Sequence, residues 1–140
     1  MLAISVALLS TEALLISMGF FMLSSLPLLV LKHDTPLDAR FIRGLFNVYY
    51  LAVMFAGTAT ALSYAWAGKP AFALGAACVA TLALALRRWI VIPRMDFLRS
   101  TMQATGHAAI AQFRLLHITG MLLNVAQLGW VAWALTRLAL

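Results

Sequence analysis

Three histidines are the residues of this chain best suited to bind a metal ion or a cofactor, because imidazole is the commonest protein metal ligand and titrates near neutral pH. They are His33, His107 and His117. On one helix, His107 and His117 would lie about 80° apart around the axis, which is not a shared ligand face. No cysteine or carboxylate stands at a recognisable ligand interval from them. We interpret His33 and His107 as interfacial residues and keep His117 as a candidate metal or cofactor ligand.

His117 belongs to a polar row on a predicted helix, because Asn124 and Gln127 follow it at three- and four-residue steps. Such a row should face the interior of a bundle, where polar groups need partners. The second predicted helix offers Arg43 and Tyr50 on an equivalent row, so Asn124, Tyr50 and Arg43 join His117 as candidate cofactor-binding residues. The alternative is purely structural, with interhelical hydrogen bonds worth about 0.6 kcal/mol each.

The arginines define a second candidate site. Arg43, Arg87, Arg88 and Arg94 gather at the inner ends of the second and third predicted helices, and Arg99 follows shortly after. Planar guanidinium groups bind phosphate and carboxylate through paired hydrogen bonds. We therefore predict lipid or anion binding by these five residues, with Arg94 also a candidate cofactor ligand. Anionic lipid headgroups are the simplest partner, and a haem propionate, another phosphate or an acidic loop of a partner protein are alternatives.

The composition of the chain indicates which kind of structure must position these residues. Of the 140 residues, 64% are apolar and 10% are charged, and the mean hydropathy is +0.98. Such a chain has too few polar residues to cover a water-soluble globule. Four segments are long and apolar enough to cross about 30 Å of hydrocarbon as helices: residues 2–31, 37–67, 70–92 and 108–137. We predict an all-α integral membrane protein, a four-transmembrane-helix bundle forming a single domain of residues 1–140.

Local signals mark the ends of these helices. Thr35 and Pro36 are typical of a helix start, and Gly68 with Pro70 predicts a tight turn. Pro93 should end or kink the third helix. The segment 94–103 then carries apolar residues on one face, so we expect it to lie as an amphipathic stretch on the inner leaflet.

The distribution of basic residues predicts the orientation. Four crossings place the first and third loops on one side, with eight of the ten Lys and Arg residues, and both termini with the short second loop on the other side, with two. Basic residues near the ends of crossings are retained on the cytoplasmic side. We therefore expect both termini outside, in a bacterial inner membrane. The net charge of +6 is explained by anionic lipid rather than nucleic acid, because these arginines adjoin apolar helices.

Several short pieces together resemble a known family. They are Gly19-Phe20-Phe21 leading to Pro27, Arg43-Gly44-Leu45-Phe46 with Tyr49-Tyr50, Ile92-Pro93-Arg94 with Leu98-Arg99, and Phe113-Arg114-Leu115-Leu116-His117 with Asn124. In order and spacing they resemble the transmembrane protein 205-like domain family, a domain of unknown function, within the four-helix membrane superfamily of copper-resistance protein D. The resemblance implies a four-helix membrane domain and no particular reaction. That superfamily also holds a haem-related oxidase with an early helical histidine, but no histidine precedes His33 here.

Three functions remain open on these residues. The first is a small inner-membrane protein whose polar, basic cytoplasmic side binds a haem-like or metal ligand, haem or copper, without chemistry of its own. The second is an accessory or structural subunit of a larger membrane complex or a homo-oligomer. The third is a small transporter or membrane enzyme, for which a polar site at the midplane would be expected. Glu12 is the only carboxylate within the most apolar parts of the four predicted crossings, residues 2–31, 45–67, 70–92 and 115–136. Depth arithmetic places it near the outer interface.

Overall fold

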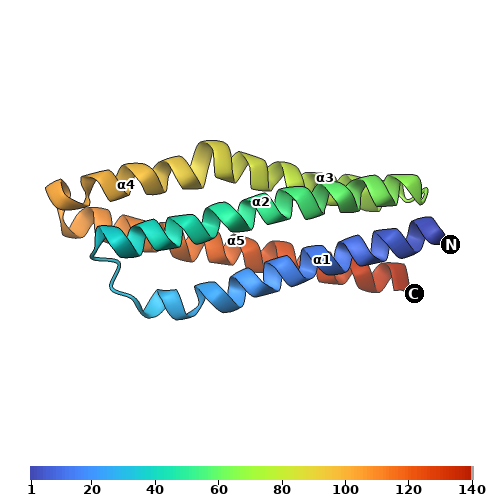
Figure 1. The fold of residues 1–140 in the computed structure, drawn as a ribbon, viewed down its shortest axis with the longest axis horizontal. Coiled ribbons are helices and arrows are strands. Elements are labelled where there is room, and N and C mark those ends of the chain that lie inside the picture. The colour runs from blue at the N-terminus through green and yellow to red at the C-terminus, as the bar shows by residue number, and fades with distance from the viewer. Residues whose placement is uncertain (140) are drawn as a thin grey trace.

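The computed structural model describes residues 1–139, and over that range the chain is helical with no β-strand (Figure 1). Helix α1 spans Leu2–Ser25 and is followed by a short 3-10 turn, η1, at Pro27–Val30. Helix α2 spans Pro36–Trp66. Helix α3 spans Pro70–Ala85, a π turn, η2, spans Leu86–Ile90, and helix α4 spans Val91–Thr105. Helix α5 spans His107–Ala139.

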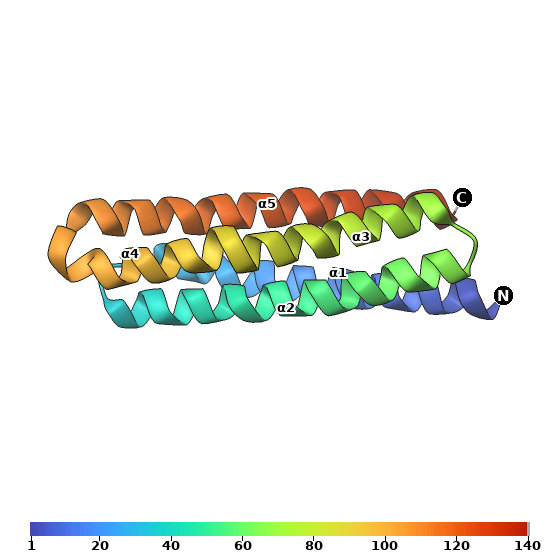
Figure 2. The same ribbon diagram turned by 90° about the horizontal axis from the view of Figure 1, so that it is seen from above.

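These elements form four long rods, which lie side by side with both termini at one end of the bundle (Figures 1 and 2). Four stretches of the described chain are long and apolar enough to cross a membrane: Leu2–Val30, Pro36–Trp66, Pro70–Ala104 and His107–Leu138. The predicted fold class, an all-α four-helix membrane bundle, is confirmed. The end opposite the termini carries the residue 31–35 loop and the turn between α4 and α5. We call it the basic end because, of the ten Lys and Arg residues, only Lys69 and Arg137 lie near the end with the termini.

Two of the predicted helix boundaries are present as local structure. The side chain of Thr35 accepts a hydrogen bond from the backbone N–H of Asp38 at 3.2 Å, so α2 begins with a capped first turn at Pro36. Gly68 has a φ of 70°, which a residue without Cβ adopts readily, and it closes the turn between α2 and α3. Both connections therefore fold as their turn residues predict.

The expectation of a separate amphipathic segment at 94–103 is wrong. The rod does not stop at Pro93, because the π turn η2 leads directly into α4 and the helical path runs on to Thr105. Met95, Leu98 and Met102 are buried in the bundle core, where α4 contacts α2 and α5. The apolar face of the segment therefore covers protein and does not lie on the leaflet surface.

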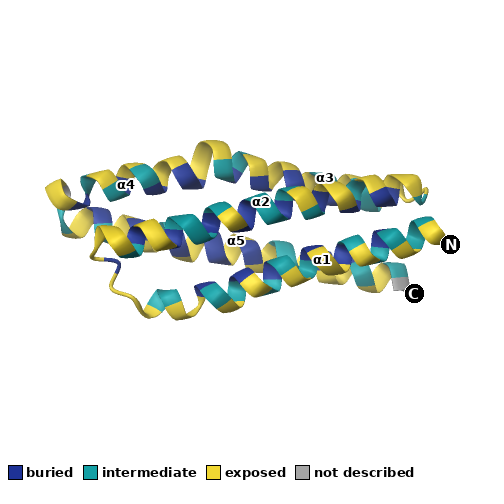
Figure 3. Ribbon diagram, viewed as in Figure 1, coloured by how far each residue is buried: buried dark blue, intermediate teal, exposed yellow. Residues whose placement is uncertain are grey.

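Helix α2 is the centre of the fold, because it packs along both α1 and α3. Buried positions follow a stripe along the inner face of each rod, and exposed positions follow the outer face (Figure 3). Phe20, Phe55 and Leu62 are examples of large apolar side chains that are about two-thirds or more exposed, at 69%, 74% and 67%. A bilayer would cover such side chains, as expected for membrane-spanning helices.

Glycine allows one close contact that affects the site. A Cβ added to Gly120 of α5 would overlap the ring of Phe46 on α2. Phe46 is fully buried and packs edge-on against Phe21 at 4.9 Å between ring centroids. The absence of a side chain at Gly120 therefore lets α5 approach the aromatic core on the side that also carries His117.

Candidate functional site at the basic end of the bundle

Two histidines meet inside the basic end. Nε2 of His33 lies 3.0 Å from Nδ1 of His117, within hydrogen-bond distance, and both residues are 0% exposed. His33 belongs to the loop between η1 and α2, and His117 belongs to α5. His33, which we interpreted as an interfacial residue, is therefore enclosed by protein and paired with His117. The two residues are 84 positions apart, so spacing along a single helix could not reveal the pair.

A serine extends the pair into a chain of three side chains. Oγ of Ser25, the last residue of α1, lies 2.8 Å from Nε2 of His117, and Ser25 is also fully buried. The chain Ser25, His117, His33 thus joins the end of α1, helix α5 and the loop that leads into α2. We call these three residues the histidine cluster.

The loop presents His33 in an unusual backbone conformation. Its φ is 61°, and His33 is the only non-glycine residue of the described chain with a positive φ. This left-handed region disfavours residues with a Cβ and typically costs on the order of 1–3 kcal/mol. The contact with His117 and the burial of the ring are the interactions in the structure that offset this cost.

The hydrogen bonds of the cluster have two consistent arrangements. In one, His33 donates to His117 and His117 donates to the hydroxyl of Ser25. In the other, the hydroxyl of Ser25 donates to His117 and His117 donates to His33. In both, Nδ1 of His33 has no hydrogen-bond partner among the described residues, although it is buried. The cluster therefore ends at one unsatisfied imidazole nitrogen beneath the loop.

Aromatic rings and charges surround the two imidazoles. The ring of Phe46 meets His117 edge-on at 5.6 Å between centroids, and Phe113 lies 6.3 Å from His33. Burial lowers the pKa of His33 below its usual 6.5, and the positive charge of Arg114 acts in the same direction. The backbone of Leu31, followed by the charges of Asp38 and Asp34, acts in the opposite direction and raises this pKa. Desolvation is the largest effect, so this environment favours a neutral His33.

The residues around this cluster do not fit a haem or a tetrahedral metal ion. No group of three or more His, Cys, Asp or Glu side chains within the described part of the chain could hold a metal ion. A tetrahedral metal bonded to two imidazoles at 2.0–2.1 Å would hold their nitrogens about 3.3 Å apart or more, whereas His33 and His117 are 3.0 Å apart. A haem would need a cavity beside His117, but both imidazoles are sealed by packing.

A second polar cluster lies further along α5 and involves a different tyrosine from the one predicted. The hydroxyl of Tyr49 donates to the side-chain carbonyl of Asn124 and lies 3.4 Å from Oε1 of Gln127. The amide of Asn124 lies 3.4 Å from the backbone carbonyl of Met18. Tyr50 is buried beside Phe46 instead, with ring centroids 6.0 Å apart. Asn124 thus holds α5 to α2 and α1 and presents no free polar group to a ligand.

The predicted arginine site is divided among separate partners. Arg43 donates two hydrogen bonds to Asp96, both at 3.0 Å, so it is neutralised and joins α2 to α4. Arg99 approaches the same carboxylate at 3.6 Å.

The remaining arginines point to other partners. Arg87 donates to the side-chain carbonyl of Asn47 at 3.0 Å. Arg94 donates to Gln112 at 3.1 Å, with its guanidinium over the ring of Phe97. The structure therefore does not bring Arg43 and Arg94 to His117 as one cofactor site, and Arg88 has no hydrogen bond or ion pair within residues 1–139.

Fold and site together define a class: a helical membrane-spanning bundle with a buried histidine cluster and a basic end. No family model, curated protein or solved structure matches the chain.

Proposed function

We propose that the protein is a small, non-enzymatic module of the bacterial inner membrane whose basic end responds to protonation. The placement of that end in the cytoplasm, with both termini outside, is supported by the eight-to-two division of Lys and Arg residues. Membership of the transmembrane protein 205-like domain family is part of the proposal and is supported by matching residues that include Pro27, Pro93, Arg94 and His117. The ligand that we propose for this module is a proton bound by the histidine cluster.

The observation that carries this proposal is the size of the space between the two imidazoles. Their facing nitrogens are 3.0 Å apart and sealed from solvent, which leaves room for one hydrogen atom and nothing larger. A haem-like or metal ligand would have to displace the loop or widen the pair, so the geometry favours the proton over both. Ionisable groups inside a membrane protein are rare and by default mark function.

Protonation should loosen the loop. A proton added to the cluster creates an imidazolium without access to water, and a second proton would set two N–H groups face to face. An open loop would hydrate His33 and remove both penalties. Because the pKa of His33 in the closed form lies below 6.5, the neutral pair stabilises the closed loop above that pH. This stabilisation is lost as the pH falls through the lowered pKa.

A distance measurement across the basic end tests this proposal. Spin labels on cysteines introduced at the exposed positions Lys32 and Ala111, in a Cys78→Ser background, would report the separation of the loop from α5 in lipid nanodiscs. We expect a narrow distribution at pH 8 and a longer, broader one at pH 5. The variant His33→Gln keeps an amide that can hydrogen-bond but does not titrate, so its distribution should be the same at both pH values.

The third histidine provides the matched control. His107 is exposed at the start of α5, so His107→Gln should keep the full pH response. A wild-type distribution that is identical at pH 8 and pH 5 would contradict the proposal and leave the cluster a structural role alone. A response that disappears in His107→Gln but persists in His33→Gln would exclude the cluster as the sensor.

An accessory subunit is the second candidate function, and one residue favours it. Glu12 is exposed on α1 within an apolar span, and it forms no ion pair in the part of the chain that the structure describes. A basic side chain on a neighbouring membrane protein would neutralise it. On this hypothesis Glu12→Gln should lose a partner that co-purifies with the wild type in mild detergent. A wild type that purifies alone at native expression level would argue against it.

A further inference from the structure

Three hollows join end to end along the half of α2 nearest the basic end. The first, of about 430 Å³, is the most polar of the three and is lined in part by Arg40 and Arg99. The second, of about 500 Å³, shares Leu37 and Arg40 with it and is apolar beyond them. The third, of about 270 Å³, shares Leu45 and Val48 with the second and lies between α1 and α2. We call this continuous surface the α2 groove.

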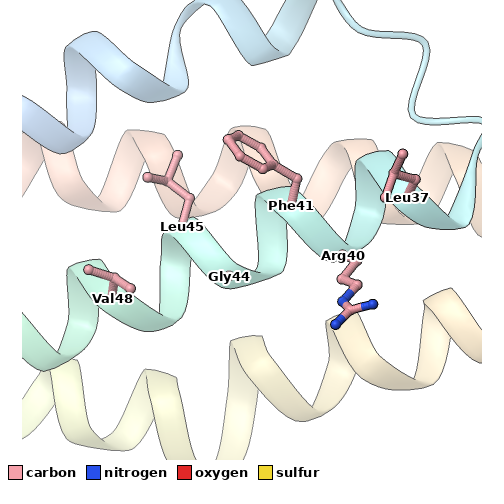
Figure 4. Close-up of a pocket in the computed structure, with 6 residues that line it drawn as sticks. All are labelled: Leu37, Arg40, Phe41, Gly44, Leu45 and Val48. Atoms are coloured by element: carbon pink, nitrogen blue, oxygen red, sulfur yellow. The ribbon is translucent and has the colours of Figure 1, made fainter.

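The middle of the groove is shaped by a glycine. Gly44 has no neighbouring atom within 4 Å of the position that a Cβ would occupy, so the helix surface is hollowed there. Figure 4 shows Phe41 and Leu45 on the α1 side of this hollow and Arg40 on the α4 side. The groove therefore has an apolar floor and one basic edge.

The polar end of the groove carries uncompensated positive charge. Arg40 is exposed and has no hydrogen bond or ion pair within residues 1–139. Arg99 lies 3.6 Å from Asp96, but that carboxylate already accepts two hydrogen bonds from Arg43. The guanidinium groups of Arg40 and Arg99 thus flank the end of the apolar part of the groove. The single carboxylate of Asp96 is shared between Arg43 and Arg99.

From this combination we propose that the α2 groove binds one anionic phospholipid, with its phosphate between Arg40 and Arg99 and an acyl chain along Gly44 towards Tyr49. Arginine favours phosphate because its fork of donors matches the phosphate oxygens. An acyl chain is the apolar partner that membrane-facing side chains such as Phe41 and Val48 meet by default. The site lies apart from the histidine cluster, because neither His33 nor His117 lines it.

The depth of the groove agrees with this occupant. At 1.5 Å per residue, the 31 residues of α2 are about 46 Å long, whereas the hydrocarbon is about 30 Å thick. If the outer end of α2 lies at one interface, the other hydrocarbon edge falls about 20 residues away, near Phe46. Arg40 is then about 9 Å further out, and its long side chain reaches back into the headgroup layer. The apolar stretch from Phe46 to Ala52 lies within the hydrocarbon of the same leaflet.

Native mass spectrometry of the delipidated full-length protein provides the test. Phosphatidylglycerol and phosphatidylcholine with identical acyl chains would be offered in equal amounts. We expect retention of one phosphatidylglycerol, with a preference on the order of tenfold over phosphatidylcholine from the two arginines. Arg40→Gln should reduce the preference strongly. Gly44→Leu should abolish retention of either lipid, because its side chain fills the open space in the groove.

A glycine elsewhere supplies the matched control. Gly129 on α5 is also exposed and has no neighbouring atom within 4 Å of the position that a Cβ would occupy, so Gly129→Leu adds the same group away from the groove and should retain the lipid. Equal retention of both lipids by the wild type would overturn the proposal, as would unchanged binding in Gly44→Leu. Competition by glycerol phosphate as effective as that of the whole lipid would show that the headgroup alone binds, which also overturns it.

Discussion

Ser25 connects the end of α1 to α5 through a single hydrogen bond to His117, and its loss would leave a buried imidazole nitrogen without a partner. Such a group costs on the order of 1–3 kcal/mol. We therefore expect Ser25→Ala to lower the free energy of unfolding by about 1–2 kcal/mol, measured by denaturant titration in mild detergent.

Ser17→Ala is the matched control for that measurement. Oγ of Ser17 bonds only the backbone carbonyl of Ala13 in its own helix and lies at the exposed face, so its removal should change the unfolding free energy by less than about 0.5 kcal/mol. Equal effects of the two substitutions would mean that the bond between Ser25 and His117 contributes nothing to the closed structure.

Gly120 permits a helix contact that a methyl group would obstruct. The Phe46 ring that faces it is fully buried between Phe21 and His117, so the ring has little freedom to move aside. Overpacking of this kind usually costs about 1–3 kcal/mol. We expect Gly120→Ala to destabilise the protein by that amount in the same titration, whereas Gly129→Ala, in open space, should be neutral or stabilising.

Residue types predict the polar positions better than they predict their partners. His117 and Asn124 do face the bundle interior, as their row on the helix predicts. The partner on α2 is Tyr49 rather than Tyr50, because adjacent residues differ by about 100° around a helix and small rotations decide which one faces α5. His33 could not be predicted as a partner, since a left-handed loop conformation directs it inward.

At the scale of elements, the π turn at Leu86–Ile90 explains why Pro93 does not end the third rod. A π turn shifts the hydrogen-bond register, and the backbone N–H of Val91 bonds the carbonyl of Leu86. Pro93 then occupies the first turn of α4, where backbone N–H groups lack a regular partner and proline is tolerated. Sequence patterns identify proline as a helix breaker but give no sign of the π turn before it.

This arrangement predicts a small effect of removing the proline. Because the first turn of α4 does not need the missing N–H, Pro93→Ala should change the free energy of unfolding by less than about 1 kcal/mol. Thr81→Pro places the same ring at an exposed position inside α3, beyond its first turn, and should cost about 3 kcal/mol. A large gain in stability from Pro93→Ala would show that the proline strains the rod.

At the scale of the whole molecule, apolar length and turn residues are sufficient to predict four crossings. The polar contacts between the rods are less predictable, because Arg43 with Asp96 and Arg87 with Asn47 join residues 53 and 40 positions apart. Their pairing depends on the rotation of each helix about its axis and on the register shift at the π turn. Periodicity within one helix predicts neither the rotation of that helix nor the register shift. The division of the arginines among separate partners is therefore apparent only in the folded bundle.

Both termini lie at the end away from the basic connections (Figure 2), so one experiment on the orientation reports on the whole bundle. Basic residues resist translocation, and eight of the ten belong to the opposite end. This end should therefore lie in the cytoplasm.

Alkaline phosphatase, which requires the oxidising side of a bacterial inner membrane, should be active when fused to the C-terminus. The same enzyme fused after residue 103, near the end of α4 at the basic end, should be inactive. A fluorescent protein that folds in the cytoplasm should give the reverse pattern. Replacing Lys69 with Gln should not change either result, because it removes charge only from the less basic side. The opposite activities would show that the bundle has the inverted orientation. Arg40 and the α2 groove would then lie in the outer leaflet, and the histidine cluster would face the pH outside the cell.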